Sequence, residues 1–332
     1  YLQPLHYATG SFAYEYLEDD DPWTYAREMK YVALEKRLDV DYFRNPNHLD
    51  PYPPAFAMIT GIMHQTSSDA QWTLKFFNSL IIALGFIFFF FMAQRLTKNS
   101  KIALAATFVL SMVPAYLSHF IWAHSLIPLL FFILIYCYER QFINKSYFLP
   151  TAIAVSAILL THPFQAIKLG IMALLYLSVR WLYQKKFPIK LVTASVFGVI
   201  LSLSWWAFKA KRQIAMQTGG GAAAQQQVLA AGTTTSTLFS KAWSAFTNLF
   251  DPFAGSATRA YSFSDFFIAT KPNMINSPIG WGIAISLLLV LAFVFLVFRY
   301  KKLLEKRNYW LAITALWFLF TFLGVNSKTF NL

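Results

Sequence analysis

Eight apolar stretches constrain the fold of this chain more than any other feature of its sequence. Most are close to the length of about 20 residues that an α-helix needs to cross a membrane. The chain of 332 residues is 57% hydrophobic and 13% charged, which is more apolar surface than one globular core of this size can bury. We therefore expect an all-α, polytopic transmembrane helix bundle with about eight spans. The stretches are 72–94, 102–118, 122–138, 147–162, 164–183, 189–208, 278–298 and 309–325.

Basic residues gather in four of the loops between these stretches, and short cytoplasmic loops are known to collect Lys and Arg. All four loops fall on the same side of an eight-span arrangement, which is therefore predicted to be cytoplasmic. The net charge of +13 is then mostly loop charge, so no nucleic-acid partner is expected. The residues are Arg95, Lys98, Lys101, Arg140, Lys145, Arg180, Lys185, Lys186, Lys190, Arg299, Lys301, Lys302, Lys306 and Arg307.

The acidic residues are concentrated elsewhere, since 11 of the 15 lie in residues 1–70. This segment is predicted to be a first outer loop. A later outer loop contains an uncharged stretch rich in Gly, Ala, Gln and Thr that should be mobile, and the loop is either a lid or a plain extracellular connection. We expect the chain to be incomplete at both ends. The predicted regions are 1–70, the first outer loop; 71–208, six spans; 209–277, the long outer loop; and 278–332, the last two spans.

The sharpest local feature is the acidic run Glu18-Asp19-Asp20-Asp21-Pro22-Trp23. Asp19 and Asp21 would project to the same side of an extended chain, where their oxygens could share a divalent cation such as Mg²⁺ or Mn²⁺. Alternatively, the aspartates cap a helix that begins at Pro22 and interact with its dipole. The pattern leaves both interpretations open.

Two histidines, His119 and His124, lie in an uncharged loop between the second and third predicted spans. They could bind a metal or contact a phosphate, or they could be interfacial polar residues beside Trp122. His162 precedes Pro163 at the same predicted depth and could join them, or it could be an ordinary histidine at a helix end.

Lys168 lies in the first turns of the fifth predicted span, on the outer side. An ionisable residue there is costly enough to suggest a function, and a lipid phosphate is an obvious partner. Snorkelling of the side chain to the interface is the alternative. Lys209 and Arg212 form a similar outer cluster with Lys211 and could attract the same anion.

Several classes of protein are not supported. No P-loop, dinucleotide fingerprint, nucleophile elbow or zinc-protease helix occurs in the sequence. The spans also lack the polar or charged residues expected of an ion pathway at the midplane.

Two motifs give the chain a family resemblance. They are Asp21-Pro22-Trp23-Thr24-Tyr25-Ala26-Arg27-Glu28 and Asp50-Pro51-Tyr52-Pro53-Pro54. In their order and spacing they resemble the GT-C superfamily of integral membrane glycosyltransferases, and within it the catalytic subunit of oligosaccharyltransferase, especially its single-subunit archaeal and bacterial forms. The match extends from residue 18 to about residue 162.

The resemblance implies roles for individual residues. Asp21 is similar to the aspartate that binds the metal and contacts the acceptor, with Asp19 beside it, while Trp23 and Tyr52 would contact substrate. His124, and with it His119, would replace the second acidic motif, although Trp122 stands where an aspartate is expected. Ser262-Phe263-Ser264-Asp265 is similar to a third motif and makes Asp265 a metal ligand. The family's Trp-Trp-Asp acceptor motif does not occur in the sequence.

The implied activity is metal-assisted, inverting transfer of a glycan from a polyprenyl (dolichyl or undecaprenyl) phosphate or pyrophosphate carrier to a polypeptide acceptor. It would take place on the outer face of a prokaryotic plasma membrane or of an endoplasmic reticulum membrane. Lys168, Arg212, Lys209 and His162 would hold the phosphate side of the donor. The alternatives are a monosaccharide transferase that uses a polyprenyl-monophosphate sugar, a non-catalytic scaffold, and a transporter of the lipid carrier.

Overall fold

The protein is all-helical over the residues that the computed structural model describes, and no strand occurs among them. These residues are 20–35, 53–113, 116, 121–219, 264–268, 280–299, 301, 305 and 308–325. The helices are α2 (Asp20–Glu35), α3 (Ala55–Ser67), α4 (Ala70–Thr97), α5 (Ser100–Leu110), α7 (Leu126–Gln141), α8 (Phe148–Thr161), α9 (Pro163–Gln184), α10 (Ile189–Gly219), α13 (Gly282–Phe298) and α14 (Tyr309–Val325). Short helical turns are η1 (Ala123–Ser125), η2 (Lys145–Tyr147) and η3 (Ser264–Ile268).

Four helices are long and apolar enough to cross a membrane by length and composition. The other four apolar stretches form shorter helices, so the structure supports a membrane helix bundle but does not confirm eight spans. The long helices are Ala70–Thr97, Ala123–Gln141, Gln165–Gln184 and Ile189–Ala207. The shorter ones are Ser100–Leu110, Lys145–Thr161, Gly282–Phe295 and Tyr309–Gly324.

The second predicted span, 102–118, corresponds to α5 over its first part. α5 ends at Leu110, and Met112 and Val113 then donate tight-turn hydrogen bonds to Val109 and Leu110. Pro114 follows in the sequence, and a proline disfavours the helical conformation of the residue before it. The apolar composition therefore continues past the point where the helix stops.

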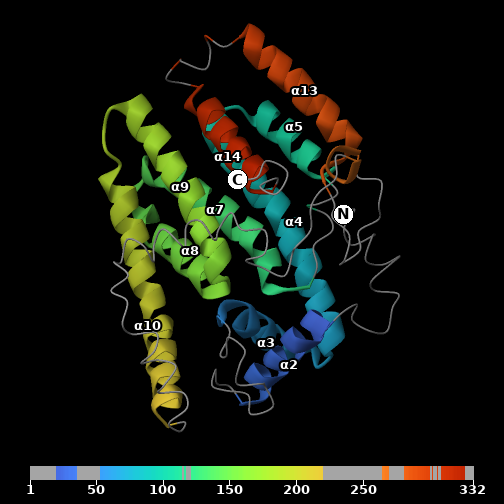
Figure 1. The fold of residues 1–332 in the computed structure, drawn as a ribbon, viewed down its shortest axis with the longest axis vertical. Helices are drawn as coiled ribbons and strands as arrows, with labels where there is room; N and C mark the ends of the chain where they lie inside the picture. Colours follow the sequence, from blue (N-terminus) through green and yellow to red (C-terminus); the bar gives the residue numbers. More distant parts are fainter. Residues whose placement is uncertain are drawn as a thin grey trace, which may run out of the picture.

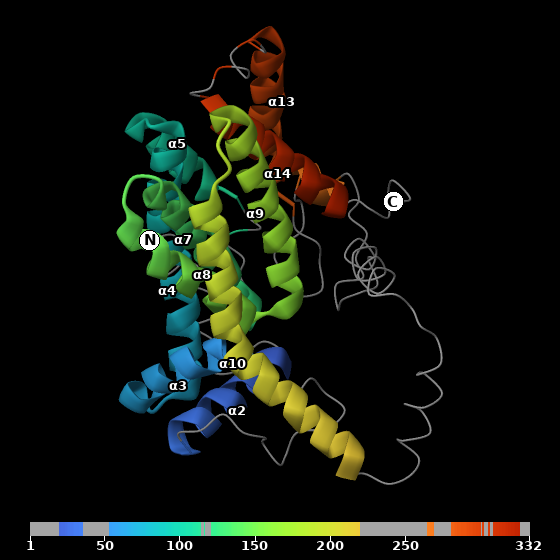
Figure 2. The ribbon, with the colours of Figure 1, turned by 90° about the vertical axis from the view of Figure 1, so that its left-hand side faces the viewer.

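The end of α4, the end of α7 and the turn between α9 and α10 lie toward one end of the bundle (Figures 1 and 2). Gln141, at the end of α7, donates to the Lys190 carbonyl at the start of α10, at 2.9 Å. Tyr309, at the start of α14, bonds Glu139 in the last turn of α7. We call this the basic-loop end. α2 and α3 pack across the opposite end, where α4 begins, which we call the α2–α3 end (Figure 1).

Two buried clusters divide the core between these ends. One joins α4, α7, α8, α9 and α14 around Ile135, Tyr138 and Tyr176. The other joins α2, α3, α4, η1 and the start of α7, and it includes Met29, Leu74 and Ala123. The second cluster lies at the α2–α3 end, so it positions the sequence motifs that we consider next.

Two predicted boundaries change. α2 begins at Asp20, so Asp21 lies in the first turn of a helix and not in the extended segment that the metal interpretation assumed. α10 continues to Gly219, beyond the predicted span end at residue 208. Lys209 and Arg212 therefore lie on a helix, while most of the predicted long outer loop lies outside the described residues.

Candidate functional site

The acidic motif opens helix α2, which packs firmly against its neighbours. Pro22 occupies the first turn, where a missing backbone N–H costs nothing, and carboxylates there interact favourably with the helix dipole. Tyr25 and Met29, one turn apart, are buried on the same face. Tyr25 meets the ring of Phe56 of α3 edge to face, with centroids 5.0 Å apart. The acidic motif is therefore held at the start of a helix that is anchored to α3.

The loop with His124 joins the same cluster. Ile121 and Ala123 are buried with Tyr25 and Met29 of α2, and Trp122 packs against this cluster. The structure thus brings together two motifs that are about 100 residues apart in the sequence. They share one hydrophobic support at the α2–α3 end of the bundle.

His124 and His162 are in direct contact. Their ring centroids are 3.9 Å apart, and the ring of Trp122 lies 4.4 Å from that of His124. His162 also caps α9, because its Nδ1 accepts a hydrogen bond from the backbone N–H of Gln165 at 3.3 Å. Since Nδ1 accepts, His162 is neutral with its other nitrogen protonated. Burial and the charge of Lys168 lower the pKa of His162 to about 4, in agreement with this state.

This cluster contains a buried polar atom without a hydrogen bond within the residues that the structure describes, as do several other sites, among them Arg140 and Arg180. The Nδ1 atom of His124 is buried and has no hydrogen-bond partner among the described residues. Lys168 lies in the second turn of α9, with an exposed side chain and no ion pair in the described part of the chain. One free cation beside two imidazoles favours an anionic ligand such as a phosphate, which Lys can attract and an imidazole N–H can bond.

Two further polar residues at this end were missed from the sequence. Lys75 and Asn78 of α4 are buried, with 4% and 2% of their surface exposed. They are three residues apart and so lie on the same face of the helix. A lysine this close to the start of a predicted span should have attracted the same attention as Lys168.

The remaining predicted ligands cannot be placed together. Asp19, Tyr52 and His119 lie outside the described residues. The backbones of Asp21, Lys209, Arg212 and Asp265 are helical, but their side chains lie outside the described part. Among described side chains, no group of three or more His, Cys, Asp or Glu residues could hold a metal ion. Trp23 is described and is 44% exposed.

A second polar cluster lies at the basic-loop end. Glu139 is buried, and its carboxylate accepts hydrogen bonds from the hydroxyls of Tyr176 at 2.6 Å and Tyr309 at 3.0 Å. The Arg180 Nε atom lies 3.8 Å from Glu139 Oε1, and both side chains are only 7% exposed. The Arg180 guanidinium also covers the ring of Tyr309, 4.3 Å from its centroid. This cluster joins the last turn of α7, α9 and the start of α14.

Comparison with known protein families, curated proteins and solved structures finds no match to the chain. A function for the protein therefore depends on its motifs and on the geometry of the α2–α3 end.

Proposed function

We propose that the protein is an integral membrane glycosyltransferase that moves a glycan from a polyprenyl phosphate or pyrophosphate carrier to a polypeptide acceptor on the outer face of the membrane. One observation supports this most strongly. The helix that begins with the acidic motif shares a buried cluster with the loop of His124, and His124 in turn contacts His162 near Lys168.

In this proposal the phosphate side of the donor binds Lys168 and the imidazoles. Lys168 has no ion pair among the described residues, so its charge is available to a ligand. His162 caps α9 through its Nδ1, and in the proposal its ring lies beside the phosphate that Lys168 binds. Lys209 and Arg212, on α10, would contribute further positive charge around the same group.

In this proposal the acceptor binds at the acidic motif. The acceptor nitrogen or hydroxyl attacks the anomeric carbon from the face opposite the carrier, and the bond from that carbon to the phosphate oxygen breaks. The carrier phosphate leaves with the bonding electrons, and the acceptor loses its proton to a carboxylate of the acidic motif. Attack from the opposite face inverts the configuration at the anomeric carbon. Asp21 orients the acceptor, with Trp23 and Tyr52 contacting substrate and Asp19 close by.

Asp21 would also be the first ligand of a divalent metal, Mg²⁺ or Mn²⁺, with Asp19, Asp265, His124 and His119 as further ligands. Such a metal, when bound, neutralises charge that develops on the departing phosphate. The described residues supply His124 for this set, next to the His162 ring. The metal is therefore a proposal that depends on Asp21 and should be tested through that residue.

The direct test is transfer by the purified chain in lipid nanodiscs, with a polyprenyl-linked sugar as donor and a labelled peptide as acceptor. Asp21→Asn should abolish transfer and leave thermal unfolding unchanged. Asp69→Asn is the matched control. It removes one carboxylate at the same end, but asparagine can still cap α4 as Asp69 does through its bond from the Trp72 N–H. Wild-type transfer by Asp21→Asn would overturn the proposal.

The same assay separates the alternatives. A monosaccharide transferase would use a polyprenyl-monophosphate sugar and reject an oligosaccharide on pyrophosphate. A transporter would move the carrier between leaflets without cleaving it, and a scaffold would bind no donor. Any of these results would replace oligosaccharide transfer as the activity.

A further inference from the structure

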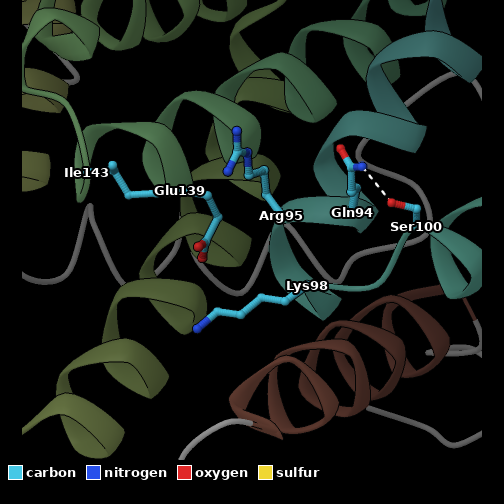
Figure 3. A pocket seen from close by; sticks show the side chains of 6 residues that line it. All are labelled: Gln94, Arg95, Lys98, Ser100, Glu139 and Ile143. Atoms are coloured by element: carbon cyan, nitrogen blue, oxygen red, sulfur yellow. Dashed lines mark hydrogen bonds between the residues drawn. The ribbon is translucent and has the colours of Figure 1, made fainter.

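A cavity of about 470 Å³ lies at the basic-loop end, away from the proposed transfer site (Figure 3). Three segments form it: the last turn of α4, the first residue of α5, and the end of α7 with the turn after it. Within it the side-chain amide of Gln94 donates to the Ser100 hydroxyl at 2.8 Å. The lining residues are Gln94, Arg95, Lys98, Ser100, Glu139 and Ile143.

The cavity presents uncompensated positive charge. Neither Arg95 nor Lys98 has an ion pair within the described residues. Glu139 is the one acidic residue in the lining, but its oxygens already accept from Tyr176 and Tyr309, and Arg180 lies beside it. Because the carboxylate is already stabilised by these groups, the two cations of α4 remain available for an anion.

The position of the cavity at the end of α4 indicates the source of the anion. α4 has 28 residues and is therefore about 42 Å long at 1.5 Å per residue. The hydrocarbon core of a bilayer is about 30 Å thick, so if α4 crosses the membrane, one of its ends must reach the headgroup region. Arg95 and Lys98 close the helix at the end that the loop charges assign to the cytoplasm. Ile143, beside them, is 72% exposed and offers apolar surface to a lipid.

We propose that this cavity binds the phosphate of an anionic phospholipid. Arg95 and Lys98 contact the phosphate oxygens, and Ile143 contacts the glycerol and upper acyl chain. Basic pockets between membrane helices at a cytoplasmic surface suit such headgroups. The bound lipid would join the end of α4 to the end of α7, and this site is independent of the proposed transfer reaction.

The test uses the full chain in a neutral detergent and a short-chain phosphatidylglycerol as probe, with binding measured by calorimetry. The pocket variant is Arg95→Gln with Lys98→Asn. The control is Lys186→Gln with Lys185→Asn, which removes two charges from another exposed loop at the same end. The control also matches the backbone, because Lys98 and Lys185 both close helices in the left-handed region, with φ of 55° and 56°. Asparagine tolerates that conformation.

We expect saturable binding of one phosphatidylglycerol by the wild type. The pocket variant should bind about 30-fold more weakly, as expected for the loss of two basic contacts at a lipid phosphate, and the control should stay within about twofold. Equal loss in the control would overturn the proposal, because the attraction would then be general surface charge. Equal binding of a phosphatidylcholine of the same chain length, or displacement by glycerol phosphate at the same concentration, would also overturn it, since the site would then not select an anionic lipid.

Discussion

The two ends of the bundle treat ionisable groups in opposite ways. At the basic-loop end, the buried carboxylate of Glu139 has two tyrosine hydroxyls and an arginine around it. At the α2–α3 end, Lys168 has no ion pair and the Nδ1 atom of His124 has no hydrogen bond among the described residues. Lys168 is exposed, so a ligand can reach its charge, whereas the buried Glu139 carboxylate is already bonded by protein groups. The difference separates a structural cluster from a candidate site.

Loss of Glu139 should have the largest effect on stability. Glu139→Leu leaves the Arg180 charge buried without its partner, and breaking a buried pair in this way costs about 3–5 kcal/mol. The double variant Glu139→Leu with Arg180→Met should recover part of this loss, because no charge is then left uncompensated. Thermal or denaturant unfolding in detergent measures both. If the single variant were as stable as the wild type, the cluster would not be structural, and the contrast between the ends would fail.

Loss of Lys168 should weaken donor binding and leave stability almost unchanged. Lys168→Gln should weaken donor binding about 10- to 100-fold, the range of one hydrogen bond to a charged group, with stability changed by less than about 0.5 kcal/mol. Lys168→Arg should keep most of the binding because it keeps the charge. The Michaelis constant for the polyprenyl-linked donor and a parallel unfolding curve report the two quantities. A stability loss without a binding loss would place Lys168 in the structural class.

His162 sharpens the comparison, because it combines a structural bond with a proposed ligand contact. His162→Ala should cost about 1 kcal/mol through loss of the α9 cap, whereas His162→Asn should retain the cap. Both should weaken donor binding, since both remove the imidazole. Unfolding curves and donor titrations separate the two roles, and normal donor binding by His162→Asn would leave His162 with the cap alone.

His162 should also make the stability of the fold depend on pH. The pKa of His162 is about 4 in the folded protein, below the ordinary value of 6.5. Between these values the unfolded state binds more protons, so stability falls as the pH drops from about 6.5 to 4. In His162→Asn this part of the fall should disappear. Unfolding curves at several pH values would test it, and an unchanged profile in the variant would contradict the buried, neutral state of His162.

The helical fold could be predicted from the sequence, because apolar length and loop charge are local properties. The side of the membrane that the loop charges predict stays a prediction. Eight full-length spans are not confirmed, and within the second predicted span α5 ends at Leu110, before Pro114.

The polar clusters were only partly predictable. His124 and His162 were expected at one depth, and the structure places their rings in contact. The Glu139 cluster was missed because its partners are far away in the sequence: Tyr176 is 37 residues from Glu139 and Tyr309 is 170. A local pattern cannot show that such residues meet, and Glu139 beside Arg140 resembles an ordinary charged loop.

The central claim is that the α2–α3 end holds the phosphate of a lipid-linked donor. A structure of the full chain in nanodiscs with a non-cleavable phosphonate analogue of a polyprenyl-linked sugar would test it most directly. The prediction is phosphonate density within hydrogen-bonding distance of Lys168 and His162, with the sugar toward the start of α2. Phosphonate density only at the basic-loop end, or elsewhere away from Lys168, would contradict it.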